Sequence, residues 1–298
     1  MGPIVVVAGA TGNLGGHVTR ELVKRGAVAR ALVRRGTPAD KVSVLRQAGA
    51  EVVEVDFEVG SLTTACAGAS CVVSTLAGLR GVIVDAQSRL LEASVAAGVP
   101  RFIPSDYSID FTKYPGGNNR NLDLRREFHA VLDKAPIAAT SIFNGAFADM
   151  LTGQAPFVLF ERRRTLAWGD PDVKMDLTSV HDSGAYTAAA ALDPNTPRAL
   201  RIAGDQISSR ELAVLMTELT GTTFKVLRPA GLGVFRLLIK LTRAMTPTSD
   251  ALYPPWQGMQ YMHDMMSGVA RHASLDNGRY PMPKWTTARD VLLAHLQK

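Results

Sequence analysis

The chain has 298 residues, of which 46% are hydrophobic and 20% charged, and this composition excludes a largely disordered protein. Its net charge of +6 suits an anionic ligand, but the lysines and arginines are scattered along the sequence, which argues against a nucleic-acid partner. No apolar run approaches the roughly 18 residues of a membrane span, and Cys66 and Cys71 have no companions at metal-ligand spacing, so we expect a reduced, cytoplasmic protein with no membrane partner and no metal.

Strand and helix patterns alternate through the first half of the chain. Apolar, β-branched runs predict strands at 3–8, 28–33, 51–55, 71–76, 101–104 and 138–143. Helical spacing predicts helices at 14–25, 38–48, 62–67, 82–97 and 122–132. The first strand begins so early that we expect no signal peptide. Strands of this kind, buried on both faces and joined by helices, predict an α/β fold with a doubly wound parallel Rossmann sheet.

The pattern weakens after about residue 150. We expect a hairpin at 157–166, short strands at 200–203 and 224–227, a loop at 247–256, and helices at 183–192, 209–219, 234–245 and 286–296. Asp182 is the expected N-cap of the first of these helices, and Ser208 or Ser209 that of the second. The prediction is a Rossmann domain at 1–150 and a smaller C-terminal α/β lobe at 151–298, interleaved with the sheet and not folding independently.

A glycine-rich turn lies between the first strand and the first helix. It reads Gly9-Ala10-Thr11-Gly12-Asn13-Leu14-Gly15, and each of its three glycines has a separate task in dinucleotide binding. Gly9 allows the sharp turn, Gly12 lets the backbone approach the pyrophosphate, and Gly15 lets the helix pack closely on the strand. The N–H groups at the start of the helix then face the phosphates. The GxxGxxG spacing points to the extended or atypical short-chain dehydrogenases.

The end of the second strand predicts the form of the cofactor. A protein that binds NAD(H) places Asp or Glu there, against the ribose 2′-hydroxyl, whereas this strand ends in Arg34-Arg35. Guanidinium groups pair well with a 2′-phosphate. We therefore predict NADP(H), with Arg34 as the phosphate ligand and Arg35 and Lys41 as helpers.

Other strand ends supply the remaining predicted cofactor contacts, because ligands lie at the carboxyl ends of parallel strands. Asp56 and Phe57 fall where the adenine ring is expected. The nicotinamide side is predicted to involve Thr75, Leu76, Ala77, Pro104, Ser105, Phe143 and Asn144.

Four segments together resemble the NmrA-like family, the atypical short-chain branch that includes isoflavone and phenylcoumaran benzylic ether reductases. They are the turn GATGNLG, the arginine end of the second strand, Arg101–Tyr107 (RFIPSDY) and Ser141–Phe147 (SIFNGAF). RFIPSDY is similar to the family's RFxPSEFG signature and is the most specific of the four. The resemblance is clearest over 3–150 and implies NADPH-dependent reduction.

The resemblance also implies a catalytic position on the helix after the fifth strand. The plant reductases carry a lysine there, and counting back from Ile137 and Thr140 places it at Arg125. Arginine is a poor proton donor but can anchor a substrate oxygen. The expected catalytic residues are therefore Tyr107, Arg125 and Ser105, with Arg125 lowering the pKa of Tyr107; packing on the cofactor is the equal alternative for Tyr107.

Two functions remain open at this point. The first is an NADPH-dependent reductase of a small apolar carbonyl or enone compound, with a pocket that includes Phe147, Met150, Trp168 and Trp256. The second is an NADP(H)-sensing protein without turnover, which would use a protein partner. A small-molecule substrate is the expected partner of the enzyme, and a homo-oligomer is possible for either.

Overall fold

A six-stranded parallel sheet forms the centre of the N-terminal half. The computed structural model describes residues 2–246 and 250–297. The strands lie in the order β3-β2-β1-β4-β5-β6 and run as β1 (Ile4–Ala8), β2 (Val28–Arg34), β3 (Glu51–Val55), β4 (Cys71–Ser74), β5 (Arg101–Ile103) and β6 (Ala138–Ala139). This order confirms the doubly wound Rossmann sheet. It reverses between β1 and β4, which is where such sheets bind their ligands.

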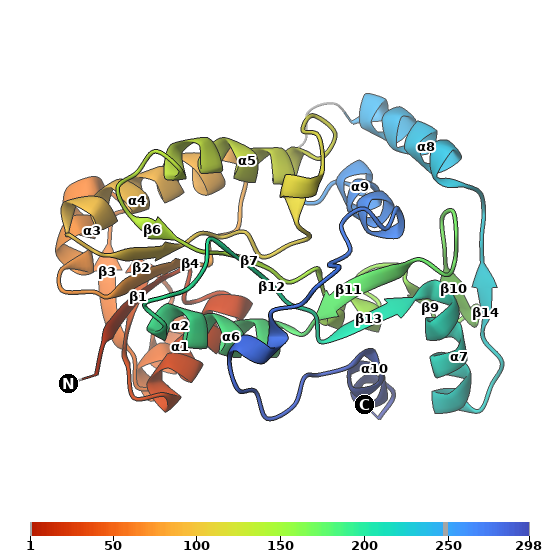
Figure 1. Cartoon of the computed structure of the whole chain (residues 1–298), viewed down its shortest axis with the longest axis horizontal. Coiled ribbons are helices and arrows are strands. Elements are labelled where there is room, and N and C mark those ends of the chain that lie inside the picture. The colour runs from red at the N-terminus through yellow and green to blue at the C-terminus, as the bar shows by residue number, and fades with distance from the viewer. Residues whose placement is uncertain (1, 247–249, 298) are drawn as a thin grey trace.

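Helices cover both faces of the sheet (Figure 1). The first five are α1 (Asn13–Lys24), α2 (Ala39–Gln47), α3 (Val59–Cys66), α4 (Gln87–Ala96) and α5 (Arg120–Leu132), and α6 (Val180–Leu192) follows later in the chain. One apolar core joins the sheet to α1, α2 and α6 through side chains such as Val18, Val42 and Tyr186. A second core joins the other face to α3, α4 and α5 through Leu62, Leu90 and Phe128.

Three small sheets accompany the six-stranded sheet, all formed by the chain from residue 141 onward. β7 (Ser141–Phe143) pairs with β12 (Ala199–Arg201), and β11 (Lys174–Thr178) lies between β8 (Ala146–Phe147) and β13 (Asp205–Ser208). The third sheet holds the predicted hairpin, β9 (Val158–Leu159) and β10 (Arg164–Leu166), with β14 (Lys225–Leu227). The strands β11 and β13 are absent from the prediction because their polar residues interrupt the apolar pattern.

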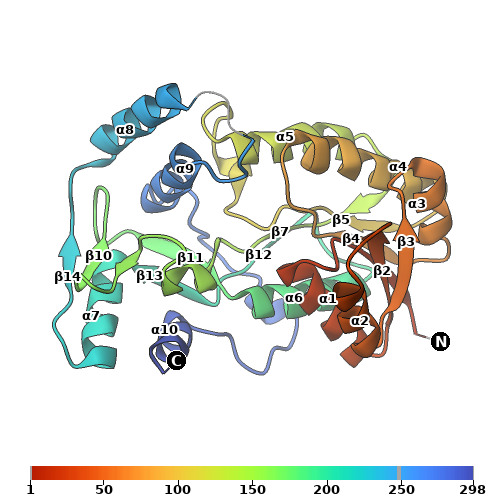
Figure 2. The ribbon, with the colours of Figure 1, turned by 180° about the vertical axis from the view of Figure 1, so that it is seen from behind.

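The C-terminal half contributes four further helices. These are α7 (Ser209–Thr220), α8 (Leu232–Met245), α9 (Pro255–Met266) and α10 (Ala288–Leu296), and one-turn helices occur at Phe111–Lys113, Ala148–Thr152 and Asn277–Arg279. Figure 2 shows α8 on the outside of the molecule, at the end opposite the N-terminus. The methionines at 259, 262, 265 and 266 pack into the apolar core of this half.

Several predicted boundaries differ from the structure. The helix expected at 82–97 is a π-helical segment, Gly81–Ala86, followed by α4. The prediction of Asp182 as an N-cap is wrong, because α6 begins at Val180 and Ser179 caps it by accepting a bond from the Asp182 N–H. Residues 247–249 of the expected loop lie outside the described residues, and the loop ends where α9 begins at Pro255.

Neither cysteine forms a disulfide, and both are buried. Burial raises the pKa of the Cys66 thiol to about 11 and that of Cys71 to about 12, so both side chains act as small apolar groups. Among the described residues, no helix combines the length and apolar character needed to cross a bilayer.

Candidate functional site: the glycine turn and the neighbouring strand ends

The glycine turn after β1 closes against the loop after β4. Gly9 has a φ of +84°, and a Cβ placed on it would lie 2.7 Å from the Thr75 carbonyl oxygen. A Cβ on Gly15 would overlap the Gly9 carbonyl oxygen and lie 2.6 Å from Thr75 Oγ1. The Thr75 N–H and hydroxyl both donate to the Ala8 carbonyl oxygen, each at 2.8 Å. Only glycine fits at Gly9 and Gly15, and Thr75 holds the two loops together.

The first turn of α1 presents backbone N–H groups without competition from nearby side chains. Gly12 is the N-cap, no side chain caps the helix, and its first turn contains no acidic residue. Thr11, Gly12 and Asn13 are exposed. Uncapped N–H groups and the positive end of the helix dipole form an anion site, so this turn fits the phosphates of a dinucleotide.

Two arginines, Arg34 and Arg35, lie at the carboxyl end of β2, next to this turn. The side chains of Arg34 and Arg35 are exposed, and in the parts of the chain that the structure describes the Arg34 side chain makes no hydrogen bond or ion pair. The Arg34 carbonyl oxygen is fixed by Thr37, whose hydroxyl donates to it at 2.6 Å. Lys41 lies exposed in the following helix, α2. The arrangement leaves positive charge available at the end of β2, where the sequence predicts the ribose 2′-phosphate.

The end of β3 carries a strained residue. Phe57 has a φ of +63°, a conformation that is uncommon for an aromatic residue, and its side chain is half-buried. Its neighbour Asp56 is exposed and accepts a hydrogen bond from the Glu58 N–H at 3.0 Å, and this bond lowers the pKa of the Asp56 carboxyl. Backbone strain of this kind is often retained at ligand sites, which favours the predicted adenine contact here.

Ser105 is fixed at the end of β5 by three partners. Its hydroxyl donates to the Leu76 carbonyl oxygen at 2.6 Å, and its N–H donates to the Gln87 side-chain oxygen at 2.9 Å. Arg125 Nε donates to the Ser105 carbonyl oxygen at 3.0 Å, and its Nη1 donates to the Asn121 carbonyl oxygen at 2.9 Å. The structure thus brings Ser105, Leu76 and Arg125 together. Gln87 is absent from the prediction because no motif marks it.

Tyr107 lies in the core rather than in the cleft. Its side chain is 8% exposed and packs in the core that also contains Tyr186 and Ile142. Burial raises the pKa of the Tyr107 hydroxyl, and Arg125 bonds to backbone oxygens instead. The expectation that Arg125 lowers this pKa is therefore wrong, and the placement favours packing over proton donation.

A buried acid next to Tyr107 binds a histidine from α5. Asp106 is fully buried, and its Oδ2 lies 2.6 Å from His129 Nε2. Arg198 Nη2 contacts the other ring nitrogen of His129 at 3.3 Å. Asp106 Oδ1 and both polar atoms of the Asn144 side chain are buried and have no partner among the described residues. Unpaired buried polar atoms are costly, so their presence at these strand ends is consistent with a polar ligand.

Pro104 and Phe143, the remaining predicted contacts, are buried at the ends of β5 and β7, and Ala77 is exposed in the loop after β4. Phe143 packs edge-on against Phe111, with ring centroids 5.3 Å apart, so it supports the strand end from within the core.

The apolar residues proposed for a substrate pocket largely pack against the apolar cores of the two halves. Trp168 stacks on Phe235 with ring centroids 4.2 Å apart, and Trp256 is 3% exposed. Met150 packs on the core of the C-terminal half and Phe147 on that of the Rossmann sheet. These contacts favour core packing for the four residues, and an open pocket that they line stays a prediction.

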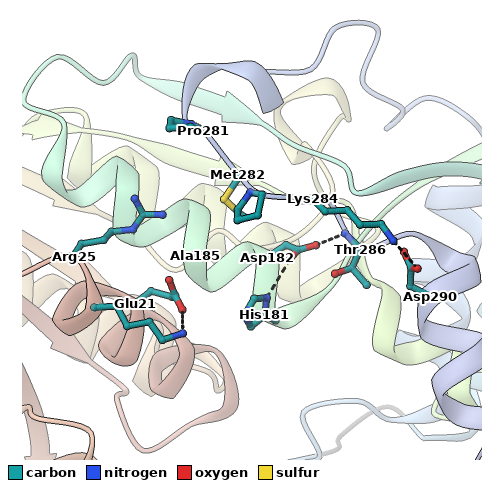
Figure 3. A pocket seen from close by; sticks show the side chains of 12 residues that line it. Glu21, Arg25, His181, Asp182, Ala185, Pro281, Met282, Lys284, Thr286 and Asp290 are labelled. Atoms are coloured by element: carbon teal, nitrogen blue, oxygen red, sulfur yellow. Dashed lines mark hydrogen bonds and ion pairs between the residues drawn. The ribbon is translucent and has the colours of Figure 1, made fainter.

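One cavity, of about 510 Å³, lies between the C-terminal end of α1, helix α6 and the segment 281–290 (Figure 3). Its walls include His181 and Asp182, whose side chains contact each other at 3.2 Å although they are adjacent on α6. The Asp182 carboxylate also accepts the Thr286 N–H at 2.7 Å, which gives it a structural task. Lys284 pairs with Asp290 on the same wall, at 2.8 Å.

Comparison with known proteins gives one family. The model of the NmrA-like family matches residues 2–246. The isoflavone reductase homolog IRL of Zea mays is 31% identical over 74% of this chain and 75% of its own length. Pinoresinol reductase 1 of Arabidopsis thaliana is 29% identical over 73% of this chain and 74% of its own length.

Solved structures agree with this grouping at the level of the fold. A crystal structure of isoflavone reductase superposes with a TM-score of 0.83 at 20% identity, covering 99% of this chain and 100% of that one. The complex of leucoanthocyanidin reductase from Vitis vinifera with NADPH superposes with a TM-score of 0.82 at 20% identity and the same coverage.

Proposed function

The chain belongs to the NmrA-like family, and from this premise we propose that it transfers hydride from NADPH to a small apolar carbonyl or enone compound. It is an NADP-dependent oxidoreductase of the atypical short-chain type. Its relatives include proteins named as isoflavone and pinoresinol reductases, which supports reduction over cofactor sensing without turnover.

The single observation that carries the proposal is the charge at the end of β2. Arg34 and Arg35 stand exposed beside the uncapped start of α1, and the strand ends without a carboxylate that would repel a 2′-phosphate. Guanidinium groups at this place favour NADP(H) over NAD(H), because each can donate two hydrogen bonds to one phosphate.

The residues around the cleft have separate tasks in the proposed reaction. Bound NADPH supplies the hydride. Gly12 and the first turn of α1 bind the pyrophosphate, and Ser105 fixes the loop after β4 through the Leu76 carbonyl oxygen. Arg125 has N–H donors beyond the two that bond to backbone oxygens, and these orient and polarise a substrate oxygen. Asp106 and His129 hold α5, and with it Arg125, against the end of β5.

The two cysteines bear on the compartment of the protein. Two unpaired, buried cysteines suit the reducing cytoplasm. We expect a small-molecule substrate.

The test is consumption of NADPH, followed by its absorbance, with a panel of aldehydes, ketones and enones. Turnover with at least one compound, faster with NADPH than with NADH, is the expected result. Arg125→Ala should slow this turnover, whereas Lys134→Ala, at an exposed position beyond the end of α5, should not. An absence of turnover across the panel, together with strongly different affinities for NADP⁺ and NADPH, would instead support the sensor.

A further inference from the structure

Helix α8 has an apolar face that no part of the described chain covers. Its inner face packs on the C-terminal core through Phe235 and Ile239, which are 2% and 4% exposed. Figures 1 and 2 agree that α8 lies at the outer end of the molecule, next to α9 and with its other side open. Five large apolar side chains nevertheless point outward from it: Val234, Leu237, Leu238, Leu241 and Met245.

These five residues, which we call the α8 stripe, follow helical spacing. They lie at positions i, i+3, i+4, i+7 and i+11, so they form one continuous strip along the helix. Their exposed fractions run from 38% for Leu238 to 82% for Met245. Single exposed apolar residues are ordinary, but a contiguous strip marks an interaction surface.

The polar face of the same helix is entirely basic. Arg236, Lys240 and Arg243 lie at i, i+4 and i+7, between the buried face and the α8 stripe, and the helix contains no acidic residue. Arg243 also packs over the Trp256 ring at 4.8 Å, which places its charge at the edge of the helix. An apolar strip flanked by lysine and arginine is typical of helices that lie in the headgroup region of a bilayer.

The segments next to α8 extend this positive charge. The sequence from 219 to 249 has five basic residues, Lys225, Arg228, Arg236, Lys240 and Arg243, and no acidic one. Parallel pairing of β10 with β14 sets Arg164 opposite Lys225, and the same hairpin carries exposed Arg162 and Arg163 beside one acid, Glu161. Eight of the 33 basic residues of the chain therefore lie in α8 and the segments next to it.

We propose that α8 docks on an anionic membrane surface, inserting the α8 stripe among the lipids while its basic face contacts the headgroups. Lysine and arginine stems can lie along the apolar region while their charges reach the phosphates. A second copy of the chain fits this surface less well, because a twofold contact through α8 would bring like charges together. The proposal departs from the expectation of no membrane partner, which considered only membrane-spanning segments.

The experiment is co-sedimentation of the full chain with vesicles. We expect binding to mixed phosphatidylcholine and phosphatidylglycerol vesicles, little binding to phosphatidylcholine alone, and weaker binding at high salt. The double variant Leu237→Gln/Leu241→Gln should bind about tenfold or more weakly, because it removes the centre of the α8 stripe. Arg236→Glu/Lys240→Glu should weaken binding similarly and remove its salt dependence.

Matched controls separate the α8 surface from general effects. Val214→Gln alters an equally exposed valine on α7, and Lys134→Glu reverses a charge far from α8; both should bind as the unaltered chain does. All variants should retain NADPH binding, which reports folding independently of the membrane.

Three results would overturn the proposal. The first is no binding to anionic vesicles. The second is equal loss in the α8 and control variants. The third is a dimer in solution that Leu237→Gln/Leu241→Gln converts to a monomer, which would assign the α8 stripe to a second copy.

Discussion

Arg34 is the side chain that we expect to discriminate between NADPH and NADH. It stands exposed at the end of β2, and its carbonyl oxygen is fixed by Thr37, so the backbone that carries the guanidinium is held in place. NADH and NADPH differ only at the 2′ position, and the pyrophosphate contacts at α1 are common to both. A change at Arg34 should therefore alter discrimination and leave the shared contacts intact.

Arg34→Ala is expected to weaken NADPH binding by about tenfold to a hundredfold, because a charge-assisted pair to phosphate contributes about 1.5–3 kcal/mol. NADH binding should change little. Fluorescence titration of both cofactors measures this, with Arg46→Ala on α2 as an exposed control. Equal affinity of the unaltered chain for NADPH and NADH would rule out the assignment of Arg34.

Asp106 and His129 form a pair whose two members are unequally buried. The Asp106 side chain is fully buried, whereas that of His129 is 12% exposed. Loss of the histidine leaves a carboxylate inside the protein without its 2.6 Å partner. Loss of the acid leaves a histidine that is partly exposed and still contacts Arg198.

His129→Ala should therefore reduce the free energy of unfolding by about 3–5 kcal/mol, and Asp106→Asn by clearly less. The double variant should recover part of the loss from His129→Ala. Urea unfolding of the three variants measures these differences. An equal cost for the two single changes would show that the burial of the Asp106 charge does not control this pair.

At this scale the sequence predicts residues whose roles are local. Gly9, Gly12 and Arg34 are found where the motif places them, because a turn and a strand end depend on adjacent residues. The environments of Tyr107 and Gln87 depend on neighbours distant in the chain. Tyr107 faces the core because α6, which begins at Val180, packs behind β1 and β4, and no spacing near residue 107 reveals that.

A helix begins where the sequence predicts when its N-cap belongs to a capping motif of adjacent residues. Ser208 with Glu211 and Thr287 with Asp290 form complete capping boxes, and α7 and α10 start directly after Ser208 and Thr287. The start of α6 differs from the prediction because Ser179, three residues before Asp182, caps the helix by accepting the Asp182 N–H, while the Asp182 carboxylate accepts the Thr286 N–H. The sequence predicts that all three helices exist. It misplaces the start of α6, where two residues of good N-cap type, Ser179 and Asp182, lie three positions apart.

The packing of α1 on β1 gives a prediction at the scale of the element. Gly15→Ala would place a methyl group against the Gly9 carbonyl oxygen and 2.6 Å from Thr75 Oγ1, so the helix must shift. We expect a loss of about 1–3 kcal/mol in unfolding free energy, together with weaker NADPH binding.

Gly60→Ala is the matched control. Gly60 lies in α3, and an added Cβ meets nothing within 4 Å, so alanine there should stabilise the helix by about 0.5–1 kcal/mol. Thermal unfolding and cofactor titration of both variants distinguish a steric effect at Gly15 from a general effect of glycine replacement. A Gly15→Ala protein with unchanged stability would contradict the packing described here.

The whole molecule is held together by its C-terminal segment. Asp276 accepts hydrogen bonds from the Tyr186 hydroxyl and from the Arg201 N–H, at 2.7 and 2.8 Å. Asn277 exchanges two bonds with Ala203, and Tyr280 and Trp285 pack against Tyr186. The residues after α9 thus connect the Rossmann half to the C-terminal half, although the family match ends at residue 246.

This connection predicts one cooperative unfolding transition for the full chain. Trp168 and Trp256 report the C-terminal half by their fluorescence, Trp285 reports the contact with Tyr186, and far-UV circular dichroism reports the whole. The two curves should coincide, and NADPH should shift both equally. A chain ended after residue 275 should lose the sharp transition; two separate transitions in the full chain would show that the halves fold independently.

The contacts of Asp276 also set an order of events during synthesis. Helix α6 lies on the same face of the sheet as α1, yet its Tyr186 is closed over by residues 276–285, which leave the ribosome almost a hundred residues later. Until then the nascent chain exposes an aromatic surface on its Rossmann half. That interval is when a chaperone would be most needed, and pausing of translation before residue 276 would prolong it.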